Sequence, residues 1–356
     1  MKHLLRLLGT CWFLVSSAVN AWPAQGQSKS KSSNETTHQT THCNTTVPVL
    51  FLAHHKTGTF VAIGIFTRLC QTLPASCCVL FKHPWADVLG TIARQRPRFA
   101  LTVFSGSLAS AWGGREKQIP TGGLRLVHFI REPLSIVRSS FHYHRSGHEN
   151  HSVLLTWEQP PSDIPGAVGK SRQVVSGILD TPPSRGHYCK VDAGELSRSE
   201  RDYLSAAVDK LSRQGNDTLH QHVLARASLP DALLFEAAWN FCEIRAMAAI
   251  ASSTCVLPWA LQLDIEKFEE DTAAQGQAIA DFLGQQPHGK NGGILSRKER
   301  SILVNLWFPR FDRHKSTNST QEADDLLREL RNSTDINGFL SGSMRLLKRG
   351  CPDLGY

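Results

Sequence analysis

The stretch "VPVLFLAHHKTGTFVAIGIF", from Val47 to Phe66, joins an apolar run to a segment with helical spacing. Its first part, Val47–Ala53, is a short apolar run of the kind that forms strands buried on both faces of a parallel sheet. Apolar residues then recur at helical spacing over Phe60–Leu73. A strand that passes directly into a helix is the building unit of α/β proteins.

The rest of the folded region repeats this alternation. Further strands are predicted at Phe99–Phe104, Leu124–Ile130 and Leu261–Phe268. Apolar spacing, capping residues and stop residues predict helices at Ser197–Gln214, Asp231–Ile250, Asp271–Leu283 and Ser296–Trp307. The sequence therefore predicts an α/β fold in three layers (α/β/α), with a central parallel sheet between helices.

The first residues are typical of a targeting segment. Basic residues precede an apolar run, Leu7–Val19, and small residues lie where cleavage would follow Ala21. Residues 1–21 are therefore expected to be a cleaved signal peptide or an uncleaved signal-anchor with a single membrane pass. Residues 22–46 are rich in Ser, Thr, Lys, Asn and Gln and are predicted to form a disordered stem.

Glycosylation sequons and cysteines agree with the secretory pathway. N-x-S/T sequons begin at Asn34, Asn44, Asn150, Asn216, Asn318 and Asn332. Beyond Cys11 in the targeting segment, an even number of cysteines remains: Cys43, Cys70, Cys77, Cys78, Cys189, Cys242, Cys255 and Cys351. Their spacing is not that of a zinc site, so disulfides are predicted, although the sequence does not determine which cysteines pair. Adjacent Cys77 and Cys78 are expected in separate structural disulfides rather than as acyl-transfer nucleophiles.

The formal charge of the chain is +8, which indicates anionic partners. Lys and Arg are scattered, and no long basic run with interleaved aromatic residues occurs. The composition therefore favours small anions or acidic glycans as partners, and no nucleic acid is expected.

The junction between the first strand and its helix carries an anion-binding pattern. A turn with a glycine presents backbone N–H groups at the positive end of the helix dipole, which suits a phosphate or sulfate. Lys56, Thr57, Gly58 and Thr59 would provide this site. In the P-loop of nucleotide hydrolases glycines precede the lysine, whereas here Gly58 follows Lys56. The alternative is an ordinary turn with an exposed lysine.

A second anion-binding pattern lies in "LRLVHFIREPLSIVRSSFHYH", from Leu124 to His144. An apolar strand ends at Arg131, Pro133 marks the start of a helix, and Ser139 follows the arginine by eight positions. An arginine at a strand end and a hydroxyl in the next helix could grip one terminal phosphate. In the alternative interpretation Arg131 pairs with a carboxylate and Ser139 only packs.

Together these segments resemble the donor site of the sulfotransferase family. The Lys56–Thr59 turn looks like that family's 5′-phosphosulfate loop, and the Arg-x7-Ser pattern resembles its 3′-phosphate site. A third segment, "LQLDIEKFEEDTAAQGQAIADFLG" (Leu261–Gly284), is similar to the family's late strand, acidic turn and helix. The resemblance implies a P-loop-NTPase-like sulfotransferase domain over residues 47–352 and the donor 3′-phosphoadenosine 5′-phosphosulfate (PAPS), without a metal ion.

The resemblance also assigns roles. Lys56 would contact the bridging oxygen as charge develops on the departing phosphate, and Thr57–Thr59 would bind the 5′-phosphate. Arg131 and Ser139 would bind the 3′-phosphate. The C-terminal R-K-G-x-x-G-D-W-K element of the cytosolic branch has no match, and His288–Gly293 is a poor substitute. Signal, stem and sequons instead resemble the Golgi-type branch that sulfates glycans.

Sulfuryl transfer also needs a base for the acceptor hydroxyl. His55 is the first candidate because it directly precedes Lys56, and some glycolipid and galactose sulfotransferases carry a similar "HKTG" arrangement. His54 is expected to point to the opposite side and to be structural. The reserve candidates are His83, His142, His144 and Glu236.

The sequence therefore predicts a sulfotransferase of the secretory pathway, in the Golgi lumen, that acts on a hydroxyl of a glycan or glycolipid. The loop-rich region Arg145–Asp192 is expected to contact that acceptor. Two alternatives stay open: a nucleotide kinase or NTPase-like phosphoryl transferase, and a secreted non-catalytic glycan-binding protein with the same fold.

Overall fold

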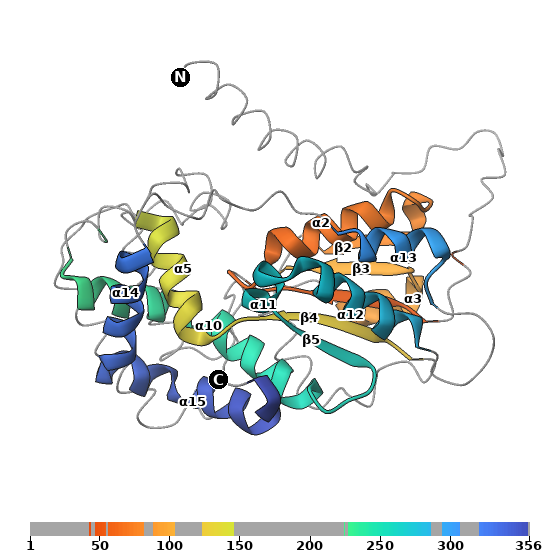
Figure 1. Cartoon of the computed structure of the whole chain (residues 1–356). Coiled ribbons are helices and arrows are strands. Elements are labelled where there is room, and N and C mark those ends of the chain that lie inside the picture. The colour runs from red at the N-terminus through yellow and green to blue at the C-terminus, as the bar shows by residue number, and fades with distance from the viewer. Residues whose placement is uncertain are drawn as a thin grey trace, which may run out of the picture. The chain divides into compact units, whose positions relative to one another are not determined.

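Five parallel strands form the centre of the part of the chain that the structure describes (Figure 1). In chain order they are β1 (Val49–Leu52), β2 (Cys78–Phe81), β3 (Phe99–Thr102), β4 (Arg125–Ile130) and β5 (Ala260–Asp264). They lie in the order β2-β3-β1-β4-β5, and each neighbouring pair is parallel. The prediction of an α/β fold with a central parallel sheet is confirmed.

The computed structural model describes residues 43, 47–54, 56–81, 88–103, 123–145, 224, 227–285, 294–306 and 320–354. All of them belong to one compact unit, residues 41–356. The predicted targeting segment 1–21, the predicted stem 22–46 apart from Cys43, the predicted helix Ser197–Gln214 and the loops after Arg145 lie outside these residues. Within the described ranges, no helix combines the length and the apolar character that a membrane span requires.

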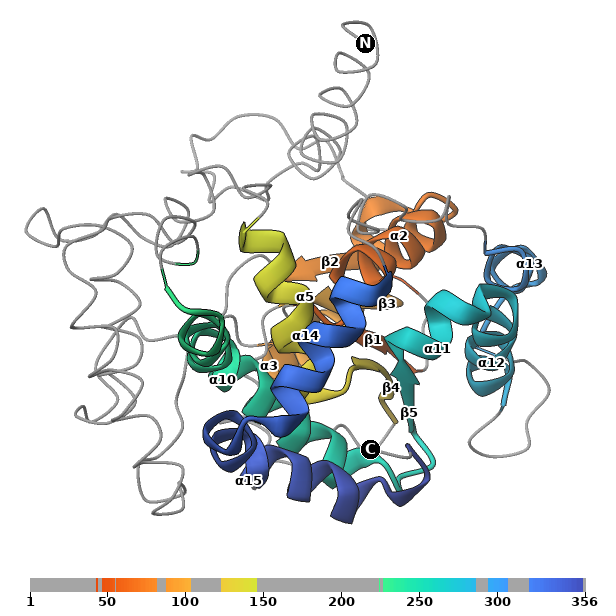
Figure 2. The ribbon, with the colours of Figure 1, turned by 60° about the vertical axis from the view of Figure 1, so that its left-hand side comes forward.

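Helices lie on both sides of the sheet (Figure 2). On one side, Leu50 and Leu52 of β1 share a buried cluster with Ile92 of α3 (Val88–Gln95) and Ile250 of α10 (Leu229–Thr254). On the other side lie α2 (Thr59–Cys70), α11 (Ile265–Glu270), α12 (Thr272–Gly284) and α13 (Arg297–Val304). The strands β1, β3 and β4 are buried along their whole length, and most of their residues are apolar; the polar exceptions are Thr102, Arg125 and His128.

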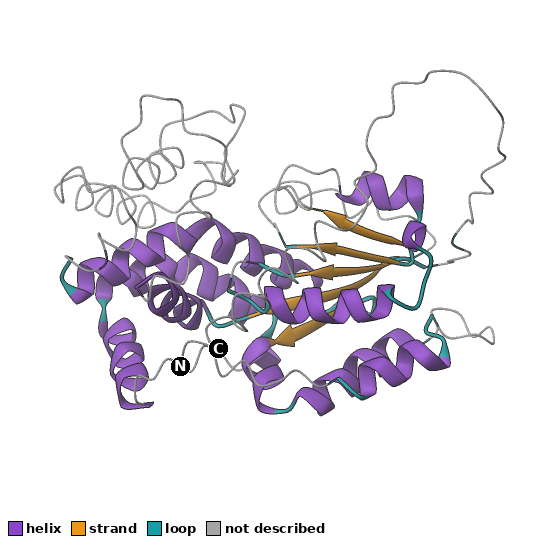
Figure 3. Cartoon of the chain, turned by 90° about the horizontal axis from the view of Figure 1, so that it is seen from above, coloured by secondary structure: helices purple, strands orange, loops and turns teal. Residues whose placement is uncertain are grey.

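A second apolar core joins four helices beyond one end of the sheet (Figure 3). They are α5 (Pro133–Arg145), α10, α14 (Thr320–Asn332) and α15 (Thr334–Gly350). The rings of Phe241 on α10 and Phe339 on α15 lie 4.6 Å apart, and both are fully buried. Since β4 is followed by α5 after two residues, this group is fixed directly to the carboxyl end of the sheet.

Most of the predicted elements are present, with one correction. The helices predicted at Phe60–Leu73, Asp231–Ile250, Asp271–Leu283 and Ser296–Trp307 correspond to α2, α10, α12 and α13, and the Ser296–Glu299 capping box is confirmed. The predicted strand Leu261–Phe268 is wrong beyond Asp264, because the carboxylate of Asp264 accepts a bond from the Glu266 N–H and starts α11. The elements β2, α3, α14 and α15 had not been predicted.

Disulfides connect three pairs of cysteines among the described residues: Cys43–Cys77, Cys70–Cys78 and Cys255–Cys351. The expectation that Cys77 and Cys78 belong to separate disulfides is confirmed. Cys189 and the side chain of Cys242 lie outside the described part of the chain. The three bonds close segments with sequence separations of 34, 8 and 96, and each restricts the unfolded chain.

Candidate anion-binding site

The order of the strands determines where a ligand would lie. After β1 the chain moves to β2 and β3 on one side of the sheet, and after β4 it moves to β5 on the other side. Ligands of open α/β sheets bind at such a switch point, outside the carboxyl ends of the strands. The residues that follow β1 and β4 are the Lys56–Thr59 turn and Arg131, so the fold brings the two predicted anion-binding segments together.

The turn after β1 has an unusual backbone. Lys56 and Gly58 both adopt positive φ angles, of 61° and 88°. A Cβ atom on Gly58 would lie 2.5 Å from Cδ1 of Ile265 at the start of α11. Glycine is therefore required at position 58 for two reasons, the left-handed conformation and the close approach of α11.

The carbonyl oxygen of His54 organises this turn. It accepts hydrogen bonds from the Thr57 N–H at 3.1 Å, the Thr57 hydroxyl at 3.1 Å and the Thr59 hydroxyl at 2.9 Å. Both hydroxyls are thus directed at His54, and no side chain caps helix α2 among the described residues. The first backbone bond of α2 runs from the Ala62 N–H to the Gly58 carbonyl. The N–H groups of the first turn and the helix dipole make this end of α2 suitable for an anion.

Lys56 connects the turn with α5. Its Nζ atom lies 3.1 Å from the centre of the Tyr143 ring, a cation–π contact. Its carbonyl oxygen accepts a hydrogen bond of 3.3 Å from Nη1 of Arg131. The side chain of Arg131 therefore contacts the main chain of Lys56, which brings the two predicted cationic residues together.

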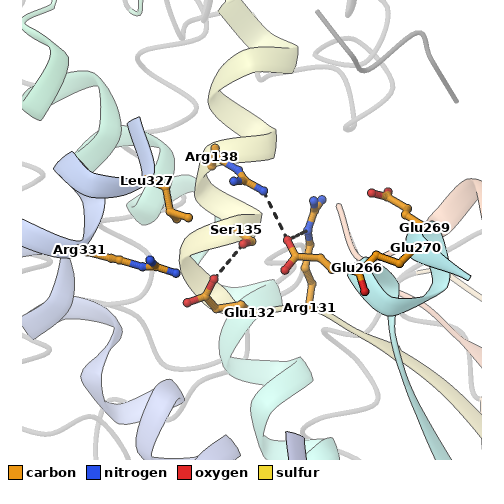
Figure 4. Close-up of a pocket in the computed structure, with 9 residues that line it drawn as sticks. All are labelled: Arg131, Glu132, Ser135, Arg138, Glu266, Glu269, Glu270, Leu327 and Arg331. Atoms are coloured by element: carbon orange, nitrogen blue, oxygen red, sulfur yellow. Dashed lines mark hydrogen bonds and ion pairs between the residues drawn. The ribbon is translucent and has the colours of Figure 1, made fainter. Parts of the chain in front are cut away.

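Arg131 also has a carboxylate partner. Its Nε lies 3.3 Å from Oε1 of Glu266, and the same oxygen lies 3.5 Å from Nη2 of Arg138 (Figure 4). The pairing of Arg131 with a carboxylate was the alternative interpretation of the sequence. Ser139 is half-buried on α5. Because it directly follows Arg138, its side chain projects from the helix about 100° away from that of Arg138.

A cavity of about 390 Å³ lies beside this ion pair. Its lining residues come from α5, α11, α14 and the end of β4: Arg131, Glu132, Ser135, Arg138, Glu266, Glu269, Glu270, Leu327 and Arg331 (Figure 4). Glu269 is exposed as a residue, but partial desolvation of its carboxyl group raises the pKa, Arg131 opposes that shift, and Glu266 adds to it. The cavity is polar and charged, with three arginines against four glutamates.

Beneath the turn, a chain of hydrogen bonds defines the proton positions on a buried histidine pair. The Thr254 hydroxyl donates to the Ile250 carbonyl and therefore accepts from Nε2 of Gln262 at 2.8 Å. This leaves Oε1 of Gln262 to accept from Nδ1 of His128 at 2.7 Å. Neutral His128 then accepts at Nε2, 2.6 Å from Nε2 of His54, so His54 donates. Both rings are fully buried, as expected for a structural His54.

Electrostatics keep His128 neutral. Burial lowers its pKa well below 6.5, the nearby His54 lowers it further, and the hydrogen bond to Gln262 opposes the shift. On the far side of the pair, Nδ1 of His54 lies 3.6 Å from Oε2 of Glu243 on α10. The pair therefore links the turn to β4, β5 and α10.

The candidates for the catalytic base fall into three groups. His55 and His83 lie outside the described residues. His144 and Glu236 are both buried, and Nδ1 of His144 lies 2.8 Å from Oε1 of Glu236, a contact that joins α5 to α10 and includes Ser140 and Asn240 in its hydrogen bonds. His142 lies half-buried on α5. The His144–Glu236 pair has the geometry of a structural contact, and His55 stays the predicted base.

Sequence reasoning did not single out Arg138, Tyr143, Gln262 or Glu266. Arg138 follows Arg131 by seven positions, but Arg131 precedes the first residue of α5, Pro133, so helical spacing does not predict that the two side chains meet. Glu266 lies in the acidic part of the segment Leu261–Gly284 that resembles the sulfotransferase family, but the resemblance gives it no role. These partners come from different elements, and only the folded structure shows which of them meet.

No metal cluster and no relative identifies the site. Within the described ranges, no three His, Cys, Asp or Glu residues are grouped so that they could hold a metal ion. The sequence matches no protein-family model, and comparisons with curated proteins and with solved structures find no match. Any proposal about function therefore depends on these residues and their geometry.

Replacing Gly58 with Ala tests the geometry of the turn. We expect the free energy of unfolding to fall by about 2–5 kcal/mol, because left-handed strain of about 1–2 kcal/mol adds to overpacking against Ile265. Gly123→Ala is the matched control: its φ of 83° is similar, but the nearest atom to its Cβ is 3.8 Å away. Urea denaturation that gives equal losses for both variants would contradict the close approach of α11.

The buried histidine pair predicts a dependence of stability on pH. Below pH 6.5 the unfolded chain binds a proton at His128 that the folded chain does not bind, so stability is present above that pH and falls as pH decreases. One such group contributes a slope of at most about 1.4 kcal/mol per pH unit. Urea denaturation at pH values between 7.5 and 5.5 should show that the free energy of unfolding changes less steeply with pH in His128→Gln than in wild type. Identical slopes for wild type and His128→Gln would refute the assignment.

Proposed function

We propose that the protein is a sulfotransferase that transfers a sulfuryl group from PAPS to a hydroxyl acceptor. The observation that carries the proposal is the meeting of Lys56, the uncapped start of α2 and Arg131 at the switch point of a parallel sheet. Two anion-binding elements in contact fit a nucleotide with phosphate groups at both the 5′ and 3′ positions. A P-loop-NTPase-like arrangement of the α/β fold is part of this proposal.

The reaction requires the protein to position two substrates, stabilise the leaving oxygen and accept one proton. The N–H groups of Gly58 and Thr59 would hold the 5′-phosphosulfate, since the Thr57 N–H already donates to the His54 carbonyl and shapes the turn. Lys56 would neutralise charge on the departing phosphate oxygen. Arg131 and Ser139 would hold the 3′-phosphate. His55 would take the proton from the acceptor hydroxyl as the sulfur–oxygen bond to the acceptor forms and the bond to the donor phosphate breaks.

The acceptor is proposed to be a glycan or glycolipid in the Golgi lumen. The net charge of +8 suits acidic glycans, and the three disulfides suit an oxidising compartment. Residues 1–21 would either anchor the protein in the membrane or be removed as a signal peptide. A labelled-donor assay against glycans, glycolipids and peptides would identify the acceptor class.

Binding of the desulfated donor tests the function directly. Calorimetry on the purified protein should show that adenosine 3′,5′-bisphosphate binds more tightly than AMP, because only the bisphosphate engages Arg131. Equal affinity for the two nucleotides would rule out the 3′-phosphate site. Metal-dependent phosphoryl transfer would instead identify a kinase-like enzyme, and glycan binding without turnover would identify a binding protein.

Substitutions at Arg131 and His55 should separate binding from chemistry. Arg131→Ala should weaken bisphosphate binding by about 2–4 kcal/mol, the cost of a lost charge-assisted contact, while the exposed Arg94→Ala changes nothing. His55→Ala should bind the donor normally and lower turnover by about 10²–10⁴-fold, the usual contribution of a general base. Near-normal turnover of His55→Ala at saturating substrate would show that another residue is the base.

A further inference from the structure

One carboxylate oxygen lies between two arginines at the edge of the cavity. Oε1 of Glu266 is 3.3 Å from Nε of Arg131 and 3.5 Å from Nη2 of Arg138, and both contacts are drawn in Figure 4. A single oxygen that contacts two guanidinium groups is also how a phosphate oxygen is commonly bound. The arrangement is thus that of an anion site occupied by a side chain of the protein itself.

The backbone of α5 places Arg138 at this site. Side chains of an α-helix lean toward its N-terminus, so Arg138 lies over the preceding turn and approaches Arg131 at the end of β4. The side chains of Arg131 and Arg138 are only 11 % and 22 % exposed. Two partly buried guanidinium groups so close together need a counter-charge, and Glu266 supplies it.

Glu266 borders open space. Its side chain is 33 % exposed and lines the cavity of about 390 Å³, so there is room beside it for the side chain to rotate away from the arginines. Glu132, by contrast, accepts a hydrogen bond of 2.9 Å from Ser135, and Figure 4 shows it turned away from Arg131. Of the cavity's carboxylates, Glu266 is the one that contacts both arginines directly, so its departure would remove an ion pair from each of them.

We propose that Arg138 binds the 3′-phosphate of the donor together with Arg131, and that Glu266 occupies this phosphate position until the donor displaces it. The inference rests on the proposed function and adds two residues to it. A phosphate dianion carries more charge than a carboxylate and offers three terminal oxygens, so it can contact both arginines at once. Displacement of Glu266 opposes donor binding, and Glu266 therefore sets the affinity for the 3′-phosphate.

The test is the affinity of Glu266→Gln for two nucleotides. Calorimetry should show adenosine 3′,5′-bisphosphate binding about tenfold more tightly to Glu266→Gln than to wild type, with AMP binding unchanged. Glu270→Gln is the matched control, because Glu270 lines the same cavity on the same helix and forms no ion pair with Arg131 or Arg138. It removes the same charge and should leave the ratio of the two affinities as in wild type.

Arg138 is tested in the same assay. Arg138→Gln should lose at least tenfold in affinity for the bisphosphate and keep its affinity for AMP. Arg331→Gln removes a cavity arginine that makes no ion pair with Glu266 among the described residues, and it should behave as wild type.

The outcomes separate this inference from the proposed function. If wild type prefers the bisphosphate but Glu266→Gln binds it equally or more weakly, Glu266 only positions the arginines and the inference is overturned. A wild-type affinity of Arg138→Gln for the bisphosphate overturns the role of Arg138. If wild type does not distinguish the bisphosphate from AMP, the proposed function fails first and the inference fails with it.

Discussion

The candidate site depends on the hydrogen bonds that converge on the carbonyl oxygen of His54. Because Thr57 and Thr59 donate to that oxygen, their hydroxyls leave the start of α2 without a side-chain cap. The same residue extends its ring into the sheet, where it pairs with His128. One residue therefore ties the backbone of the candidate anion-binding turn to the buried core of β4 and β5 through a polar pair inside a mostly apolar sheet.

Much of the fold could be predicted because buried parallel strands have a simple sequence signature. The runs at β1, β3 and β4 are apolar at nearly every position, and Pro133 and the Ser296–Glu299 capping box mark where helices begin. The strand β2 has four apolar residues, as β1 does, but it lies at the edge of the sheet and its two middle residues are only half-buried. The strand predicted at Leu261–Phe268 was too long. Ile265 and Phe268 are apolar because they are buried on helix α11, and the N-cap at Asp264 starts that helix.

The site was predictable only where its residues are close in sequence. A turn such as Lys56–Thr59 can be recognised from the types and order of its residues. Arg131 can be recognised from its position at the end of a predicted strand. The partners that complete the site, Glu266 and Arg138, come from α11 and α5, and residue type does not reveal which carboxylate meets which guanidinium. Charge pairing between distant elements is a property of the tertiary structure.

The disulfide between Cys43 and Cys77 has a mechanical consequence. Cys43 precedes β1 by only a few residues, and Cys77 directly precedes β2, which lies at the edge of the sheet. A pulling force on the chain ahead of Cys43 would therefore reach the sheet through two covalent routes, the main chain into β1 and the disulfide into β2. The load would be shared between an interior strand and an edge strand, and β1 could not be peeled away by itself. Such a junction transmits tension to the sheet as a whole.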